Sequence, residues 1–386
     1  MRSCVTINQM RIKRAIESWV KKYLQPNKVV AIYGPRRVGK TTLLENLLKE
    51  SRFKYRLDTG DNIRVQQILS SQDLELIKEY AQGYQLIVID EAQRIANVGW
   101  GLKLLVDQVE GIRVLVTGSS SFELSGQIGE PLVGRKWAFK LFPLAQMELQ
   151  EYLTPFELKE KLEEFLVFGS YPEVYLAETK AEKIEILNSL VESYLFKDIL
   201  ELEKVKGTKV LFDLLRLVAF QVGKEVSLSE LGARLGIDYK TVRRYLDLFE
   251  KSFILFNLRG LSRNLRKEIY SKSKYYFLDN GIRNAIIGNF NRLNERDDIG
   301  TLWENFLVSE RLKAQSYKRI YANNYFWRTW DGKEIDWIEE RDGKFFAYEF
   351  KIKKPRKTHF SYFQKVYPNS VFKVITLENY RKFVGC

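Results

Sequence analysis

The sequence predicts an α/β protein of several domains, whose N-terminal part is a parallel sheet between two layers of helices. The chain has 386 residues, more than one hydrophobic core usually holds. Strands predicted near residues 28–33, 53–58, 84–89 and 111–117 alternate with helical patterns, as in a parallel sheet with helical crossovers. A glycine-rich motif follows the first of these strands, at the strand-to-helix turn that suits phosphate binding.

The glycine-rich motif over residues 34–42 reads GPRRVGKTT, a complete G-x-x-x-x-G-K-[ST] match. Glycines let backbone N–H groups point at phosphate oxygens, and the following helix N-terminus adds a favourable dipole. We expect Lys40 to reach the β- and γ-phosphates of ATP and the Thr41 hydroxyl to bind Mg²⁺. The predicted ATP-binding residues are Gly34, Pro35, Arg36, Arg37, Val38, Gly39, Lys40, Thr41 and Thr42.

A second motif supports the same chemistry. The apolar run before residue 90 ends in two carboxylates, Asp90 and Glu91. Asp90 suits the Mg²⁺ shell, and Glu91 suits polarising the attacking water. Acidic residues also end ordinary strands in α/β proteins, so the weight of this motif comes from its combination with the glycine-rich loop. Together the two motifs predict ATP hydrolysis, with Lys40 and Glu91 as catalytic residues.

Two further positions have open alternatives. The run near 111–117 ends in Thr117-Gly-Ser119, where a polar side chain can sense the γ-phosphate, although Ser and Thr also end strands for ordinary turn reasons. Thr117 or Ser119 fits, and Ser119 is included among the ATP-binding residues. Arg135 is the candidate catalytic arginine, contacting phosphate in its own chain or across the interface of a homo-oligomer. The alternative is a solvated surface arginine.

The charge of the chain indicates a polyanionic partner. It carries 63 Lys and Arg against 49 Asp and Glu, a formal net charge of +14. Residues 151–200 carry 5 basic and 11 acidic side chains and have helical periodicity, which predicts an acidic helical connector. Residues 201–275 carry 16 basic and 9 acidic side chains. The basic surplus favours nucleic acid as a partner of the C-terminal half.

The part from residue 227 to 246 has the pattern of two helices joined by a tight turn at Gly236. The second helix presents basic side chains outward, and an apolar strand followed by Arg259, Arg263, Arg266 and Lys267 resembles a wing. A winged helix binding DNA is one interpretation; the alternatives are a packing module or an ATPase lid. The predicted DNA-binding residues are Lys240, Thr241, Arg243, Arg244 and Arg263.

A hairpin is predicted over residues 333–351, with Asp342-Gly343 as its two-residue loop. Arg341 then pairs with Lys344, which places Asp336 opposite Glu349 and Glu334 opposite Lys351. Two opposed carboxylates repel unless a cation or proton intervenes, and Mg²⁺ or Mn²⁺ there can activate water for phosphodiester cleavage. Glu304 is a further candidate carboxylate. The predicted nuclease-like residues are Glu304, Asp336, Glu349 and Lys351, with Asp336 and Glu349 as metal ligands; a charged strand face with a Glu334–Lys351 ion pair is the alternative.

The chain resembles a family of prokaryotic AAA-type P-loop ATPases of unknown function. The matching stretches are GPRRVGKTTLL, VIDEAQRI with WGLKLLVDQ, VTGSSSFEL, LVGRKW, FPL, FGSYPEV, FLDNGIRN, LWENFL and KEIDW…YEFK. The resemblance implies a P-loop domain, a winged helix and a C-terminal restriction-endonuclease-like domain, with DNA association. It also implies that Glu304, Asp336, Glu349 and Lys351 occupy nuclease-motif positions.

These observations predict four segments: a P-loop ATPase domain at 1–150, a helical connector or lid at 151–205, a winged helix at 206–275 and a restriction-endonuclease-like domain at 276–386. The leading hypothesis is a Mg²⁺-dependent ATPase coupled to DNA binding; a nucleotide-switched protein-interaction module and an ATP-gated DNase are alternatives. One histidine and two cysteines exclude His-rich or multi-thiolate metal sites and a disulfide framework. No apolar run of membrane-spanning length is present, so a cytoplasmic protein without a membrane partner is expected.

Overall fold

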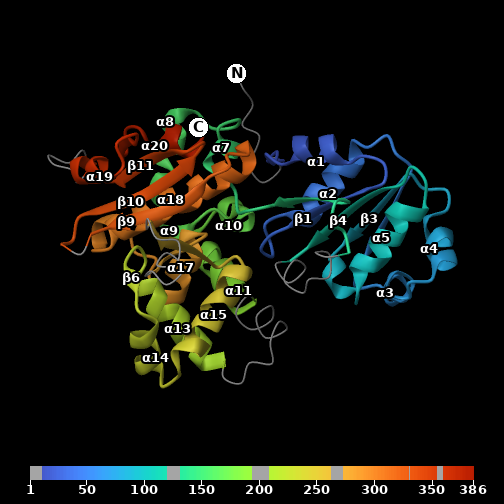
Figure 1. Cartoon of the computed structure of the whole chain (residues 1–386), viewed down its shortest axis with the longest axis horizontal. Coiled ribbons are helices and arrows are strands. Elements are labelled where there is room, and N and C mark those ends of the chain that lie inside the picture. The colour runs from blue at the N-terminus through green and yellow to red at the C-terminus, as the bar shows by residue number, and fades with distance from the viewer. Residues whose placement is uncertain (1–10, 120–130, 194–207, 262–272, 330, 354–359) are drawn as a thin grey trace. The chain divides into compact units, whose positions relative to one another are not determined.

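The computed structural model describes residues 11–119, 131–193, 208–261, 273–329, 331–353 and 360–386 (Figure 1). The chain divides into two compact units, each described by itself below. Unit 1 is Met1–Pro143 with Leu200–Lys204 and Lys251–Phe253, and unit 2 is Leu144–Ile199, Val205–Glu250 and Ile254–Cys386. Among the described residues, no helix combines the length and the apolar character needed to cross a membrane.

Unit 1 contains a five-stranded sheet in the order β2-β3-β4-β1-β5, and every neighbouring pair is parallel. The sequence predicted the first four strands, while β5 was not predicted because its apolar run, residues 137–139, is only three residues long. The strands are β1 (Lys28–Tyr33), β2 (Tyr55–Thr59), β3 (Leu86–Asp90), β4 (Arg113–Gly118) and β5 (Lys136–Lys140).

Helices cover both faces of this sheet, which gives the predicted three layers (Figure 1). On one face, alternate residues of β1, β3 and β4 form a buried apolar cluster with α3, α4 and α5. Helices α1 and α2 lie on the other face, where Val20 and Leu47 are buried. The helices are α1 (Glu17–Tyr23), α2 (Lys40–Lys49), α3 (Ile63–Ser70), α4 (Leu74–Ala81) and α5 (Val98–Gln108), with a 3₁₀ turn at Ala92–Arg94.

Unit 2 contains a seven-stranded sheet in the order β12-β11-β10-β9-β7-β8-β6. Strands β7 and β9 are parallel neighbours, so segments 206–275 and 276–386 share one sheet, and the predicted division at 275 falls within β8. The strands are β6 (Glu225–Val226), β7 (Leu255–Gly260), β8 (Ser273–Phe277), β9 (Asn323–Arg328), β10 (Glu334–Arg341), β11 (Lys344–Phe350) and β12 (Val371–Ile375).

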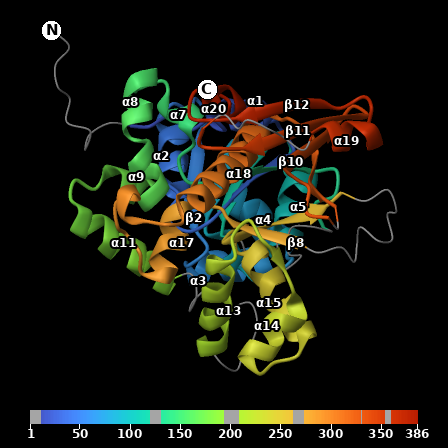
Figure 2. The same cartoon turned by 90° about the vertical axis from the view of Figure 1, so that its left-hand side faces the viewer.

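Several helices of unit 2 can be placed relative to its sheet (Figures 1 and 2). Helices α13 to α15 lie together beside β6, and α19 and α20 lie near β10–β12, while α18 runs across the sheet. The helices are α7 (Gln146–Leu149), α8 (Pro155–Glu160), α9 (Leu162–Phe168), α10 (Pro172–Leu176), α11 (Lys180–Ser193), α13 (Thr208–Phe220), α14 (Leu228–Leu235), α15 (Tyr239–Lys251), α17 (Asn280–Ile287), α18 (Ile299–Lys318), α19 (Phe360–Val366) and α20 (Tyr380–Val384). A 3₁₀ turn spans Leu293–Glu295.

The β10–β11 hairpin has the predicted register where the two strands pair, from Arg341↔Lys344 to Trp337↔Tyr348. Asp342 and Gly343 have φ angles of 49° and 70°, as a two-residue turn with two left-handed positions requires. The paired residues of this ladder end at Trp337↔Tyr348, and Asp336 and Glu349, next in the same register, are not among them. The register between β9 and β10 shifts between Ile335 and Ile338. The carboxylate of Asp336 accepts the N–H of Phe350 at 2.7 Å.

Candidate functional site

The glycine-rich loop of unit 1 lies between β1 and α2, as predicted. A side chain at Gly34 would place its Cβ 2.0 Å from the Leu141 carbonyl oxygen, so only glycine fits there. Arg37 and Gly39 adopt positive φ angles of 58° and 90°, which turn the loop around into α2. Pro35 and Val38 are buried, Arg36 is half-buried, and Arg37, Thr41 and Thr42 are exposed. The local sequence therefore produces a curled loop at a helix N-terminus, the geometry that suits phosphate.

Lys40 is held inside this loop. Its side chain is buried, and its Nζ donates to the carbonyl oxygens of Gly34 at 3.0 Å and Pro35 at 2.9 Å. Burying an ammonium group is costly unless oxygen acceptors surround it, and the loop carbonyls supply them. The cation of the motif is therefore fixed at the concave side of the loop, as a phosphate ligand should be.

The second motif meets the loop at the carboxyl ends of adjacent parallel strands. The Thr41 hydroxyl donates to Asp90 Oδ2 at 2.6 Å, and the Thr117 hydroxyl donates to Asp90 Oδ1. Asp90 thus lies between the end of β4 and the start of α2. Oxygen ligands of this kind are those that Mg²⁺ prefers, so Thr41 and Asp90 fit the predicted Mg²⁺ shell. Thr117 orients Asp90, whereas Ser119 is buried and donates its backbone N–H to Gln93 at 3.3 Å.

Glu91 follows Asp90 with a left-handed backbone, at φ 53° and ψ 42°. Its N–H donates to Asp90 Oδ1 at 3.1 Å and to the Thr117 hydroxyl oxygen at 3.2 Å. A Cβ at Gly60 would lie 2.2 Å from the Glu91 carbonyl oxygen, so the chain after β2 passes closely beneath this residue. The side-chain amide of Gln93 donates to Glu91 Oε2. Sequence reasoning missed Gln93 and Gly60; Gln93 contacts a residue two positions away, and the approach of Gly60 to Glu91 arises only once β2 and β3 are side by side.

Arg14 is a further residue of this site that the sequence did not identify. Its guanidinium is buried and donates to Val38 O at 2.7 Å and to Phe142 O at 2.6 Å. It supports the loop from behind by connecting it to the segment that follows β5. A lone arginine ahead of the first strand carries no sequence signal for such a contact.

Arg135 lies near the amino ends of the parallel strands, whereas the glycine-rich loop lies at their carboxyl ends. It precedes β5, and its carbonyl accepts the N–H of Val29 at the beginning of β1, whereas the loop follows Tyr33 at the end of β1. A strand of this length separates the two by ~15–20 Å. Its Nε contacts Asp107 Oδ1 at 2.5 Å. Phosphate contact within the same chain is therefore excluded by geometry, and contact across a subunit interface stays a prediction.

In unit 2, Glu304, Asp336, Glu349 and Lys351 gather with Lys274, Tyr276 and Glu334 in a group that we call the carboxylate cluster. Glu304 on α18 accepts the Tyr276 hydroxyl at 2.7 Å and lies 3.9 Å from Lys274 Nζ. Lys274 also donates to Glu334. The predicted contact of Glu334 with Lys351 is therefore replaced by an ion pair with Lys274, a buried lysine that sequence reasoning did not assign.

Lysines supply the counter-charges of this cluster. Lys351 Nζ lies 3.3 Å from Glu349 Oε1 and 4.0 Å from Asp336 Oδ2. Burial raises the pKa of Asp336, and burial together with the charge of Asp336 raises the pKa of Glu304 to about 7. Within the described part of the chain, no group of three or more His, Cys, Asp or Glu side chains is placed to hold a metal ion. The predicted Asp336–Glu349 metal site has no support in this geometry.

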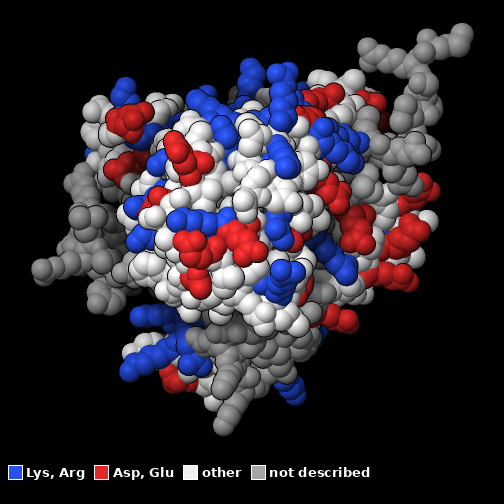
Figure 3. Space-filling view, turned by 90° about the vertical axis from the view of Figure 1, so that its right-hand side faces the viewer, with Lys and Arg blue, Asp and Glu red and all other residues white. Residues whose placement is uncertain are grey.

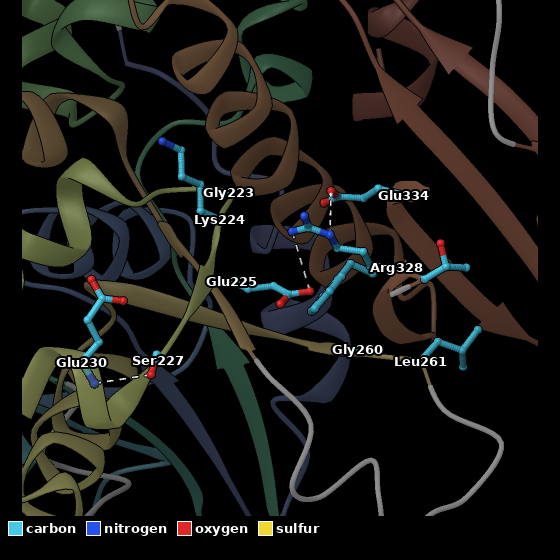
Figure 4. Close-up of a pocket in the computed structure, with 11 residues that line it drawn as sticks. Gly223, Lys224, Glu225, Ser227, Glu230, Gly260, Leu261, Arg328 and Glu334 are labelled. Atoms are coloured by element: carbon cyan, nitrogen blue, oxygen red, sulfur yellow. Dashed lines mark hydrogen bonds and ion pairs between the residues drawn. The ribbon is translucent and has the colours of Figure 1, made fainter. Parts of the chain in front are cut away.

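A polar pocket of about 810 Å³ borders the cluster and includes Glu334 in its lining. Figure 4 shows Arg328 of β9 lying between Glu225 and Glu334, at 3.8 Å and 3.9 Å. Gly223 also lines the pocket, and a Cβ there would lie 2.9 Å from Glu304 Oε1. Basic and acidic side chains both line this pocket, so it has no single sign of charge to attract a ligand.

A second groove, of about 830 Å³, lies between α15 and the strands β6 to β8. Lys240, Arg243 and Arg244 are exposed and line it together with Arg259, while Asp247 and Glu250 add acidic groups. Thr241 donates its hydroxyl to Asp238 and thereby helps to cap α15 instead of pointing to a ligand. Arg263, Arg266 and Lys267 lie outside the described residues. On the face shown in Figure 3, basic side chains alternate with acidic ones and form no continuous basic coat.

Three known families match successive parts of the chain. Residues 26–150 match the family described as "AAA domain", residues 159–293 match "Domain of unknown function (DUF8612)" and residues 299–382 match "Domain of unknown function (DUF4143)". An uncharacterized protein of Mycobacterium tuberculosis is 27% identical over 358 residues, covering 90% of this chain and 75% of that protein. An uncharacterized protein of Methanocaldococcus jannaschii is 25% identical over 334 residues, covering 82% and 73%.

Two solved structures were also found to be similar. The Walker-type ATPase PABY2304 of Pyrococcus abyssi has a TM-score of 0.46 at 15% identity, covering 72% of this chain and 96% of that one. A variant of RuvB from Thermotoga maritima has a TM-score of 0.29 at 15% identity, covering 63% and 87%. The AAA match over 26–150 agrees with the glycine-rich loop, the Asp90-Glu91 pair and the strand order. Unit 1 therefore has the parallel-sheet core of a P-loop ATPase.

Proposed function

We propose that this protein hydrolyses ATP with Mg²⁺ at the P-loop of unit 1 and couples nucleotide turnover to nucleic-acid binding by unit 2. The observation that carries the first part is the convergence of Lys40, Thr41, Asp90 and Glu91 at the carboxyl ends of β1 and β3. Two motifs that lie 49 residues apart in the sequence are joined there by a direct hydrogen bond.

In the proposed mechanism, the loop N–H groups and Lys40 bind the phosphates of ATP and hold the γ-phosphate in place. Thr41 and Asp90 are the residues that hold Mg²⁺, which neutralises charge on the phosphate oxygens when it is bound. Glu91 orients the attacking water and accepts its proton. Thr117 fixes the orientation of Asp90 by its hydrogen bond, and the burial of Lys40 keeps water from competing for its ammonium group.

ATP turnover by the wild type, Lys40→Ala and Glu91→Gln tests this proposal. Glu91→Gln removes the proton acceptor while keeping the shape of the side chain, so kcat should fall ~10²–10⁴-fold with nucleotide affinity retained. Lys40→Ala should lose nucleotide binding as well. Lys49→Ala is the matched control, because Lys49 is an exposed lysine of the same helix. No turnover by the wild type, with or without DNA, would overturn the proposal.

The second part of the proposal rests on the α15 groove. Lys240, Arg243 and Arg244 project from one helix beside Arg259, a spacing that suits contacts with successive phosphates. The order of α14, α15 and the antiparallel strands β6 to β8 supports a winged-helix interpretation of this region. Asp247 and Glu250 in the same groove favour a partner that is contacted locally rather than a broadly wrapped polyanion.

Fluorescence anisotropy with duplex, single-stranded and branched DNA at a series of salt concentrations tests this part. Removing two phosphate contacts with Arg243→Ala/Arg244→Ala should lower affinity for all sequences and reduce the salt slope by ~2. Arg234→Ala on α14 is the control, since this exposed arginine pairs with Glu230 outside the groove. The absence of DNA binding at low salt would instead favour a nucleotide-switched module that binds a protein partner.

Cleavage of DNA by the carboxylate cluster is the third candidate and has the weakest support. Lys274 and Lys351 form ion pairs with carboxylates of the cluster where a metal ion would have to bind. Incubation of plasmid and branched DNA with Mg²⁺ or Mn²⁺, with wild type and Asp336→Ala compared, tests for nuclease activity. Equal product from both proteins would exclude this cluster as its source.

A further inference from the structure

Gln93 connects the catalytic carboxylate to the end of the neighbouring strand. It lies in the 3₁₀ turn Ala92–Arg94, directly after Glu91. Its Nε2 donates to Glu91 Oε2, and its Oε1 accepts the backbone N–H of Ser119 at 3.3 Å. One side chain thus touches the residue that should activate water and the position that the sequence marks as a candidate γ-phosphate sensor.

The chemistry of the two partners fixes the orientation of this amide. A carboxylate only accepts hydrogen bonds and a backbone N–H only donates them, so Nε2 must face Glu91 and Oε1 must face Ser119. A glutamate at this position could accept from Ser119 but would repel Glu91. A lysine could donate to Glu91 but could not accept from Ser119. Both contacts together therefore require glutamine or a similarly long amide.

The backbone explains why the contact forms between residues only two positions apart. Glu91 adopts the left-handed conformation, which costs a non-glycine residue energy and persists where surrounding contacts enforce it. Asp90 and Thr117 bind its N–H, and the passage of Gly60 beneath its carbonyl leaves no room for a shift in that direction. These three contacts hold the backbone of Glu91 in place. The hydrogen bond from Gln93 holds its carboxylate.

We propose that Gln93 is a positioning residue that holds the Glu91 carboxylate and couples its orientation to Ser119 at the end of β4. A displacement of Ser119 therefore changes the hydrogen bond that Gln93 makes with Glu91. This inference rests on the proposed ATP hydrolysis. It adds that the position of Ser119, directly after β4, affects the rate of hydrolysis through Gln93.

Three variants separate the two contacts. Gln93→Glu keeps the acceptor for Ser119 and places a second negative charge beside Glu91. Gln93→Lys keeps a donor for Glu91 and removes the acceptor, and Gln93→Ala removes both. Gln108→Glu is the control for added charge, because Gln108 is exposed at the end of α5 in the same unit.

We expect kcat to fall ~10–100-fold in all three Gln93 variants, since a small displacement of a catalytic group has effects of this size. The KM for ATP and the affinity for a fluorescent ATP analogue should stay within about twofold of the wild type, because the side chain of Gln93 bonds to Glu91 and Ser119 rather than to the phosphate loop. A kcat that falls while KM and analogue affinity stay constant distinguishes a displaced Glu91 carboxylate from a loss of ATP binding.

The outcomes are distinguishable. No turnover by the wild type overturns both the proposed function and this inference. Wild-type turnover together with an unchanged kcat in the Gln93 variants overturns only the role of Gln93. A lower kcat that comes with a lower unfolding temperature and a weaker affinity for the ATP analogue indicates a purely structural effect and also overturns it. A lower kcat at an unchanged KM for ATP, with an unfolding temperature equal to that of Gln108→Glu, supports it.

Discussion

Replacing Glu304 by glutamine should stabilise the protein more at pH 8 than at pH 5. The carboxylate of Glu304 lies beneath Gly223 and accepts the Tyr276 hydroxyl, with 22% of its side chain exposed. Burial and the charge of Asp336 raise the pKa of Glu304 from 4.5 to about 7, and Lys274 at 3.9 Å offsets only part of this effect. Glutamine keeps the acceptor for Tyr276 and removes the ionisation.

The sign follows from the linkage between proton binding and folding. The folded state binds the proton of Glu304 more tightly than the unfolded state, so ionisation costs stability. Below pH 4.5 the group is protonated in both states and costs nothing; the cost grows as pH rises to about 7 and stays constant above it. At ~1.4 kcal/mol per pH unit this interval corresponds to ~3 kcal/mol. Solvent screening at the exposed part of the side chain reduces the expected effect to ~1–3 kcal/mol.

Urea unfolding at pH 5, 6, 7 and 8 and constant ionic strength measures the effect, with fluorescence of the buried Trp303 and Trp337 as the signal. The difference in unfolding free energy between Glu304→Gln and the wild type should rise by ~1–3 kcal/mol across this range. Glu185→Gln on α11 is the control, since it removes an exposed carboxylate of the same unit and should show no such rise.

A difference that stays constant from pH 5 to pH 8, or that falls with pH, would refute the argument. Either result would mean that Lys274 and Lys351 compensate Glu304 fully. The lysines would then be expected to compensate the charge of Asp336 as well, a group whose pKa is also raised by burial. The experiment therefore decides whether the cluster carries an unfavourable negative charge at neutral pH.

Three further outcomes are expected. Excess Mn²⁺ at pH 8 should leave the unfolding temperature of the wild type unchanged, because Lys351 forms ion pairs with Asp336 and Glu349. A rise in unfolding temperature that Asp336→Asn abolishes would contradict this. Arg14→Ala removes two charge-assisted hydrogen bonds behind the P-loop and should lower the stability of unit 1 by ~3–6 kcal/mol, measured by urea unfolding against Arg11→Ala. Gly60→Ala brings a Cβ to 2.2 Å from the Glu91 carbonyl oxygen and should lower kcat while ATP-analogue binding is retained; an unchanged kcat would show that the backbone at Glu91 yields.

The glycine-rich loop and its contact with Asp90 could be predicted from sequence because their parts are local. A β-branched run, a glycine-rich turn and a helix start within residues 28–49 define the loop, and one more strand end supplies Asp90. The parallel order of the strands then brings Asp90 beside Thr41. Arg14 and Gln93 could not be predicted, because their partners are backbone atoms or come from distant parts of the chain.

The carboxylate cluster shows where local reasoning fails. The Asp342-Gly343 turn fixes the hairpin register, and Trp337 pairs with Tyr348 as predicted. The register shift between Ile335 and Ile338, which redirects Asp336, depends on pairing with β9, a strand that the sequence did not indicate. The counter-charge Lys274 comes from β8, which hydrogen bonds between Tyr276 and Glu304 and between Phe277 and Asn305 hold against α18.

The sequence by itself determined the P-loop, its acidic partners, the α14–α15 pair and the hairpin turn, because each depends on residues close together in the chain. Only the tertiary structure decided that Arg135 lies away from the loop, that Gln93 contacts Glu91 and that Lys274 and Lys351 lie beside the acidic cluster. The physical reason is that hydrogen bonds and ion pairs depend on distances of a few ångströms. Strand order and register set these distances between residues far apart in sequence, and neither composition nor periodicity records them.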